Sequence, residues 1–268
     1  MLAVVLFDEE VRTSGFLQSL RALHDQGRIT VYAAATLARS AAGTAPVPGF
    51  SLGKAEAATG PSVGAAVGAL VSLLDGPLAA AMKAVPLGLV GAIRDLDDAG
   101  LNAAFLEQVS DDFPPGGGAV LAEVEEIQPL LLDALGLEHG GRLLRQRLAG
   151  AFAERRLIAE IQALRHELAR LEVLNPRQES VVLTANLRRS KGIELASAIR
   201  HARNLAAGLR REMAAKRRVF DEQAARLGQG PRAVLHRRAA VVEARMGRRA
   251  ELLERAAAGG AASKPGGV

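Results

Sequence analysis

The chain has 268 residues, which is enough for one large domain or two smaller ones with apolar cores. It contains no cysteine, and this excludes disulfides, thiolate metal sites and a cysteine nucleophile. Residues 1–140 carry 7 Lys and Arg against 17 Asp and Glu, whereas residues 141–268 carry 27 against 12, so the net charge of +5 hides an acidic first half and a basic second half. This asymmetry predicts two modules.

The first part of the chain predicts a strand, a helix and a second strand. The apolar run Leu2–Phe7 indicates a buried strand, and the apolar spacing that follows it predicts a helix ending near Gly27. Residues Ile29–Leu37 predict the second strand, and the Gly- and Pro-containing residues 41–54 predict a loop. Neither a basic leader nor a small-residue cleavage site flanks the first run, so we expect no secretory signal.

Small residues then recur at every fourth position from Gly60 to Ala92 among apolar neighbours. On a helix this spacing produces one face with almost no side chains, which allows close helix–helix packing. We expect one helix over 61–74, a turn at 75–77 and a second helix to about residue 94. The expected packing and oligomerisation residues are Gly60, Gly64, Gly68, Ser72, Gly76 and Gly88.

A second strand–helix–strand set follows this hairpin. Asn102 predicts the cap of a helix through Val109, and strand 119–124 and helix 129–135 come next. Residues 141–148 predict either a last strand or the start of the next helix. Two split βαβ halves predict an α+β, ferredoxin-like domain over 1–148 with the hairpin inserted at about 60–94.

Residues 149–258 predict a basic, all-α helical hairpin or coiled-coil bundle. Apolar residues alternate in steps of three and four along three segments, which are separated by Asn175-Pro176 and by residues 228–231. The Gly-, Ala- and Ser-rich tail 259–268 predicts disorder. The three seams contain Leu157, Ile161, Leu164, Leu168 and Leu171, then Leu195 to Leu227 with Lys216, Phe220 and Gln223 among their positions, then Leu235 to Ala256.

In the first half, the order of motifs resembles the bacterial "domain of unknown function 1269" family of predicted membrane proteins over roughly residues 1–148. The matching pieces are Val4-Val5-Leu6-Phe7-Asp8-Glu9, Gln26-Gly27-Arg28-Ile29, the glycine repeat, Asp98-Ala99-Gly100-Leu101-Asn102 with Phe105-Leu106, and Pro115-Gly116-Gly117-Gly118-Ala119-Val120-Leu121. The resemblance implies a ferredoxin-like domain with a Gly-rich apolar hairpin and contact with a membrane, and it implies no catalytic residue. Asp75, Lys83 and the long basic extension depart from the family pattern.

The length and charge of the hairpin favour membrane contact without a full span. Fourteen residues of helix over 61–74 rise about 21 Å, less than the roughly 30 Å of a bilayer core. Lys83 at the bilayer centre would cost roughly 2.5–3.5 kcal/mol. We therefore expect a re-entrant or interfacial hairpin, and the alternative is a hairpin packed within a soluble protein.

No residue pattern predicts catalysis, a cofactor or a metal. Residues 49–55 lack the spacing of a phosphate-binding loop, and the segment with Asp95, Asp97, Asp98 and Gly100 lacks the ligand set of a calcium loop. No Ser or His lies in a recognised nucleophile motif. We expect a protein that is not an enzyme and that uses no cofactor.

Clustered basic residues in the second half predict an anionic-surface binding site. Interspersed acidic residues and the lack of any helix-turn-helix, zinc or RNA-binding signature make nucleic acid an unlikely partner. A solvated Arg-rich surface without a partner is the alternative. The predicted binding residues are Arg210, Arg211, Lys216, Arg217, Arg218, Arg237, Arg238, Arg248 and Arg249.

Together these patterns predict a membrane-associated, self-assembling scaffold at the inner face of the bacterial cell membrane. Its expected partners are further copies of itself and an anionic membrane surface. The alternative is a soluble cytoplasmic adaptor or sensor, with a ferredoxin-like ligand- or partner-binding domain and a helical tether. The sequence names no small-molecule ligand for either function.

Overall fold

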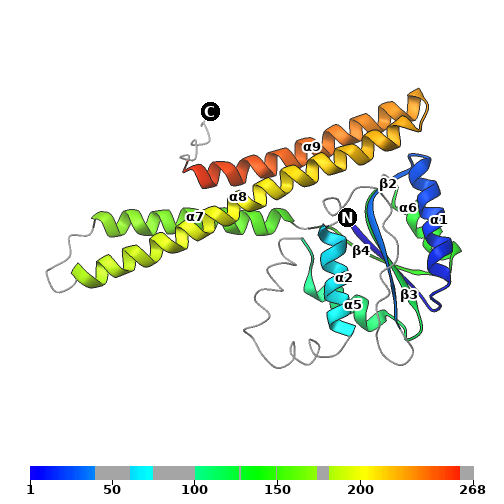
Figure 1. Ribbon diagram of the computed structural model, residues 1–268, viewed down its shortest axis with the longest axis horizontal. Helices are drawn as coiled ribbons and strands as arrows, with labels where there is room; N and C mark the ends of the chain where they lie inside the picture. The colour runs from blue at the N-terminus through cyan, green and yellow to red at the C-terminus, as the bar shows by residue number, and fades with distance from the viewer. Residues whose placement is uncertain (40–60, 75–99, 127, 149, 174–180, 260–268) are drawn as a thin grey trace. The chain divides into compact units, whose positions relative to one another are not determined.

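The computed structural model describes residues 1–39, 61–74, 100–126, 128–148, 150–173 and 181–259 (Figure 1). The chain is an α+β protein, with a four-stranded antiparallel sheet and seven helices among the described residues. The expected loop 41–54, the second helix of the hairpin and residues 260–268 of the predicted tail 259–268 lie outside these residues. The elements are β1 Leu2–Phe7, α1 Arg12–Asp25, β2 Ile29–Ala38, α2 Pro61–Leu74, α5 Ala103–Asp112, β3 Gly118–Glu126, α6 Pro129–Glu138, β4 Arg142–Gln146, α7 Gly150–Val173, α8 Val181–Ala225 and α9 Gln229–Ala258.

The sheet has the strand order β2-β3-β1-β4, and all of its pairs are antiparallel. Leu2 of β1 lies opposite Glu123 of β3 on one side and Gln146 of β4 on the other. Between β2 and β3 the register shifts by one residue, because Tyr32 is an extra residue between the pairs made by Val31 and Ala33. Such a bulge bends the strand locally and redirects a side chain.

Helices cover both faces of the sheet (Figure 1). Because successive strand residues point to opposite faces, Leu2, Val4 and Leu6 of β1 pack with α2 and α5, while Ala3, Val5 and Phe7 pack with α1 and α6. Burial from both sides explains why β1 is a continuous apolar run instead of an alternating one.

Local signals fix several element ends as the sequence predicts. Asn102 accepts a hydrogen bond from the amide of Ala104 at 3.0 Å, which confirms it as the cap of α5. Gly27 follows α1 with a φ of 71°, a conformation that costs glycine little. At the Gly-rich turn before β3, a Cβ on Gly118 would lie 2.9 Å from the Cα of Glu10, so this position has no room for a side chain. Residues 142–146 form a strand, which decides between the two alternatives for this segment.

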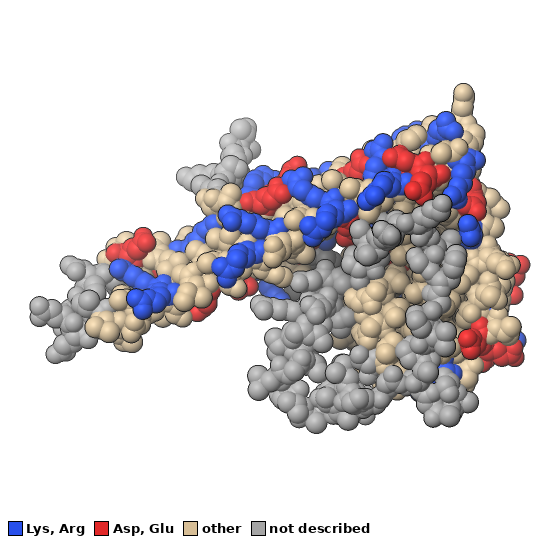
Figure 2. Space-filling model, viewed as in Figure 1, with Lys and Arg blue, Asp and Glu red and all other residues tan. Residues whose placement is uncertain are grey.

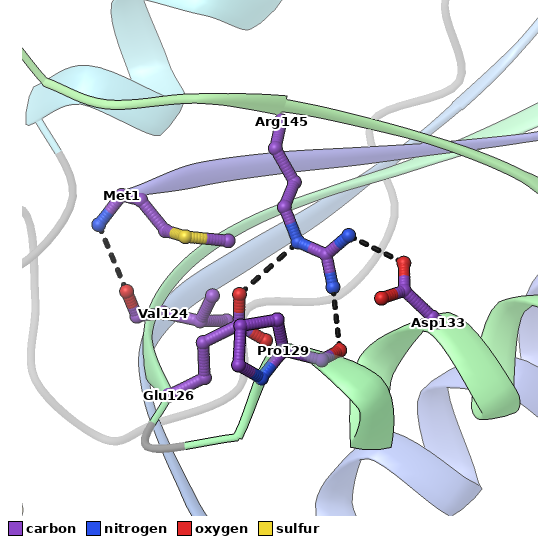
Figure 3. Close-up of polar contacts among 6 residues, drawn as sticks. All are labelled: Met1, Val124, Glu126, Pro129, Asp133 and Arg145. Carbon is purple, nitrogen blue, oxygen red and sulfur yellow. Dashed lines mark hydrogen bonds and ion pairs between the residues drawn. The ribbon is translucent and has the colours of Figure 1, made fainter.

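Arg145 of β4 closes the connection between β3 and α6 (Figure 3). Its guanidinium donates to Glu126 at 3.0 Å, to Asp133 at 2.5 Å and to the carbonyl of Pro129 at 2.7 Å. The Glu126 side chain is 5% exposed, so this ion pair is largely shielded from solvent. The Met1 nitrogen donates to the Val124 carbonyl at 2.8 Å beside it. The Arg145 contacts hold the edge strand β4 to the end of β3 and to the first turns of α6.

The described residues divide into two compact units. Unit 1 contains residues 1–150 together with 214–241, and unit 2 contains residues 151–213 together with 242–268. The predicted boundaries, 1–148 and 149–258, differ from this division, because the end of α8 and the start of α9 pack within unit 1. At 45 and 30 residues, these two helices are longer than a typical globular helix, as the sequence predicts.

Unit 2 has a core of small and aliphatic side chains from α7, α8 and α9. Leu157, Ile161 and Leu164 of the first predicted seam are buried, and Leu168 and Leu171 are half-buried. Arg249 of α9 holds Glu154 of α7 through two hydrogen bonds of 3.0 Å from Nε and one of 2.5 Å from Nη2. The carboxylate is 6% exposed, so the pair joins the two helices inside the bundle.

Candidate functional site

The described residues contain no group of three His, Cys, Asp or Glu that could hold a metal ion. One surface depression lies at the start of α1, where the Thr13 hydroxyl donates to the Glu10 carbonyl and the Ser14 hydroxyl donates to the Val11 carbonyl. Both hydroxyls thus donate to backbone carbonyls at the start of α1. The depression is lined by Glu9, Glu10, Val11, Thr13, Ser14 and Gly116.

Within unit 1, a buried ion pair joins α8 to the sheet. Glu123 of β3 is 1% exposed, and its Oε1 lies 2.5 Å from the Nζ of Lys216, whose side chain is 10% exposed. The hydroxyl of Ser62 on α2 donates to the other carboxylate oxygen at 2.6 Å. The Lys216 ammonium also lies 4.8 Å from the centroid of the Tyr32 ring, a cation–π distance. Lys216 is therefore held inside the fold by Glu123 and Tyr32, and its role in surface binding stays a prediction.

The ring of Tyr32, the residue at the β-bulge, lies beside the ion pair of Lys216 and Glu123. Its ring meets the ring of Phe220 edge-on, with centroids 5.8 Å apart, and both side chains are buried. Arg238 of α9 lies 5.9 Å from the Phe220 centroid and donates to the Glu125 carbonyl at 2.8 Å. Burial lowers the pKa of the Arg238 guanidinium from its ordinary value. The bulge in β2 thus turns an aromatic side chain toward α8.

Gln223 fixes the next turn of α8 to the start of β2. Its side chain is buried, accepts from the Thr30 hydroxyl at 2.8 Å and donates to the Ile29 carbonyl at 2.7 Å and to the His24 carbonyl. On the rim, Arg226 pairs with Asp25 at 2.8 Å. These bonds use both N–H donors of the side-chain amide and its oxygen, so this part of α8 is held in one register on the sheet.

The predicted anionic-surface residues separate into two groups (Figure 2). Figure 2 shows Lys and Arg side chains recurring along α8 and α9 on the face in view, with acidic side chains among them. Five of the nine are engaged: Lys216 with Glu123, Arg210 with Glu254, Arg217 with Asp221, Arg238 with the Glu125 carbonyl and Arg249 with Glu154. The other four are exposed and have no hydrogen-bond or ion-pair partner among the described residues: Arg211, Arg218, Arg237 and Arg248.

The described part of the small-residue repeat lies on α2. Val63, Ala66 and Leu70 face the sheet and are buried, whereas Gly64 and Gly68 are exposed. A Cβ on either glycine would meet no described atom within 4 Å. Ser72 lies within α2, and Gly60, Gly76 and Gly88 lie outside the described residues. In the described part of the chain, no helix combines the length and the apolar character needed to cross a membrane.

No family model, curated protein or solved structure matches this chain. The site is therefore defined by its own residues.

Sequence reasoning missed Glu123, Ser62 and Tyr32. A signal was nevertheless present, because Lys216 and Gln223 occupy predicted seam positions where apolar residues are expected. Polar side chains at such positions have buried partners, and here those partners come from the sheet.

Proposed function

We propose that this protein is a non-enzymatic, membrane-associated scaffold that assembles with copies of itself. In this proposal the small-residue face that begins on α2 packs helix against helix between copies. Exposed arginines of α8 and α9 bind the anionic inner face of a bacterial cell membrane.

The observation that carries the proposal is the set of four predicted binding residues that have no partner among the described residues. Arg211, Arg218, Arg237 and Arg248 remain exposed on helices where neighbouring arginines are paired with carboxylates. An arginine that stabilises no contact of the fold is available for an anionic surface. Each basic side chain near such a surface contributes about 1 kcal/mol of binding free energy.

The proposal includes a ferredoxin-like arrangement for the sheet. Support comes from the strand order β2-β3-β1-β4 and from α1 and α6, which pack on the same face. In this arrangement α2 and α5 belong to an insertion between β2 and β3 that covers the second face. A glycine zipper on α2 is part of the same proposal, supported by the exposure of Gly64 and Gly68.

The purified protein tests both halves of the proposal. We expect it to sediment with phosphatidylcholine vesicles that contain phosphatidylglycerol, to stay in the supernatant with phosphatidylcholine alone, and to be released by salt. Analytical ultracentrifugation should give a mass above that of one chain. A protein that is monomeric and does not bind anionic vesicles would contradict the proposal.

A second candidate function is a soluble adaptor with a helical tether. It is favoured by the way Gln223 and Lys216 fix the end of α8 to the sheet of unit 1, since the same helix continues into unit 2. Such a helix suits a protein that links a ligand- or partner-binding domain to a second module. If this function holds, the protein does not bind vesicles, and it binds its partner through one of the two units.

A further inference from the structure

Three arginines of α8 follow one another at intervals of 11 residues: Arg189, Arg200 and Arg211. With 3.6 residues per turn, 11 residues make three turns with an offset of about 20°, and they rise about 16.5 Å. The three side chains therefore lie on one line of the helix, over a length of about 33 Å. We name these three residues the arginine row, and all of them belong to unit 2.

The arginine row is uncompensated. All three side chains are exposed, and none has a hydrogen-bond or ion-pair partner among the described residues. The one acidic residue between Val182 and Arg211 is Glu194, which lies about 120° around the helix from the row and is held by Lys191 at 3.0 Å. The positive charges of the row are thus neither neutralised nor used by the fold.

Other basic residues of the same helix provide the contrast. Arg188 donates to the Leu171 carbonyl, Lys191 also pairs with Glu167 at 3.2 Å, and Arg210 pairs with Glu254 at 2.7 Å. These cations face neighbouring helices of the bundle and contribute to its packing. These basic residues differ from the arginine row in the side of α8 on which they lie, although their charge is the same.

Two exposed aliphatic side chains share the face of the arginine row. Val182 is 71% exposed and Ile193 is 64% exposed, and they too are 11 residues apart and in phase with Arg189 and Arg200. Arginines mixed with aliphatic side chains suit the boundary between lipid headgroups and acyl chains. The outer edge of a nucleic acid offers phosphates and no apolar surface, and residues 181–213 contain no Phe, Tyr or Trp that could stack on a base.

We infer that the arginine row lies along an anionic lipid bilayer, with Ile193 and Val182 at the headgroup boundary. This inference rests on the proposed membrane association and specifies which face of which helix makes the contact. A straight helix touches a flat surface along its whole length, so the three arginines can bind at the same time. Removing all three should weaken vesicle binding about 100-fold, since each contributes about fivefold.

The test compares two triple variants of the full chain with equal changes in net charge. One is Arg189→Gln/Arg200→Gln/Arg211→Gln, and its matched control is Arg188→Gln/Lys191→Gln/Arg210→Gln. Binding is measured by co-sedimentation with phosphatidylcholine vesicles with and without phosphatidylglycerol, and circular dichroism verifies the helix content. We expect the row variant to lose about 100-fold in its partition coefficient and the control to lose far less.

Other outcomes are equally informative. If the wild-type protein does not bind anionic vesicles, the proposed function itself is contradicted. If the wild type binds anionic vesicles and the row variant binds them equally well, the role of the arginine row is overturned and the proposed function stands. The same holds if the row variant and the control variant lose the same amount of vesicle binding. Ile193→Ser should also weaken binding to anionic vesicles. A wild-type protein that binds a DNA duplex more tightly than anionic vesicles would overturn the assignment of lipid as the ligand of the arginine row.

Discussion

Lys216 and Glu123 form an ion pair that is nearly withdrawn from water, with 2.5 Å between Nζ and Oε1. The Ser62 hydroxyl accompanies the carboxylate, and the Tyr32 ring accompanies the ammonium. Three segments that are far apart in the sequence thereby meet inside unit 1: α2, the β2–β3 pair and the end of α8. The pair holds the end of α8 to the sheet within unit 1.

Removing one partner of this pair should destabilise the protein strongly. Lys216→Met leaves the Glu123 carboxylate buried without its cation, and we expect a loss of about 3–5 kcal/mol in the free energy of unfolding of unit 1. The measurement is urea unfolding followed by the fluorescence of Tyr32, the single tyrosine. Lys216→Met/Glu123→Gln should recover part of the loss, because it removes the uncompensated charge.

The control is Arg217→Met, which breaks the exposed pair with Asp221 and should cost about 0–1 kcal/mol. An equal effect of Lys216→Met and Arg217→Met would mean that the buried pair does not anchor α8.

Gln223→Ala should loosen the same helix by a different route. The substitution leaves the Thr30 hydroxyl and the Ile29 carbonyl without their side-chain partner in a buried position. Each such group costs about 1–3 kcal/mol, and hydrogen exchange of the β2 amides should become faster. Gln162→Ala, at an exposed position of α7, is the control and should leave exchange unchanged.

The stability of unit 1 should fall as the pH falls below 6.5 because of His24. Burial lowers its pKa, an effect that outweighs the opposing influence of Asp25, and its Nδ1 accepts from the Val31 amide at 3.1 Å. The unfolded chain therefore binds a proton at a higher pH than the folded chain does, so the stabilisation is complete above 6.5 and declines below it.

His24→Asn retains an acceptor without a titrating ring. Urea unfolding of this variant should show a flatter dependence on pH than the wild type below pH 6.5. The same slope in both proteins would exclude His24 as the source.

Substitution of the exposed glycines of α2 should prevent self-assembly while leaving the fold intact. Gly64→Leu/Gly68→Leu adds side chains where no described atom lies within 4 Å of the new Cβ, and leucine favours a helix over glycine by up to about 1 kcal/mol per site. We expect sedimentation to report a lower mass at unchanged helix content. Gly208→Leu, at an open position on α8, is the control. An unchanged mass would refute a packing role for this face.

The secondary structure was largely predictable because its signals are local. A continuous apolar run marks β1, Asn102 marks the start of α5, and the small-residue repeat marks α2. The end of the first module was ambiguous, because β4 is a short edge strand in which two adjacent leucines lie between arginines, a pattern that also fits a helix.

The candidate site was only partly predictable. Lys216 counts as a surface cation until its partner is known, and that partner is a carboxylate within a buried strand. The choice between paired and unpaired arginines likewise depends on which carboxylates the neighbouring helices bring near. Such contacts arise from tertiary packing, which spacing along one chain does not specify.

Fractionation of cells that express the native protein is the most direct test of membrane association. The membrane pellet is washed first with high salt and then at alkaline pH, and the protein is followed in each fraction. The scaffold account predicts a protein in the pellet that salt releases if the arginines alone hold it, and that resists both washes if the hairpin also enters lipid. A protein found entirely in the supernatant before any wash would contradict the account and favour the adaptor.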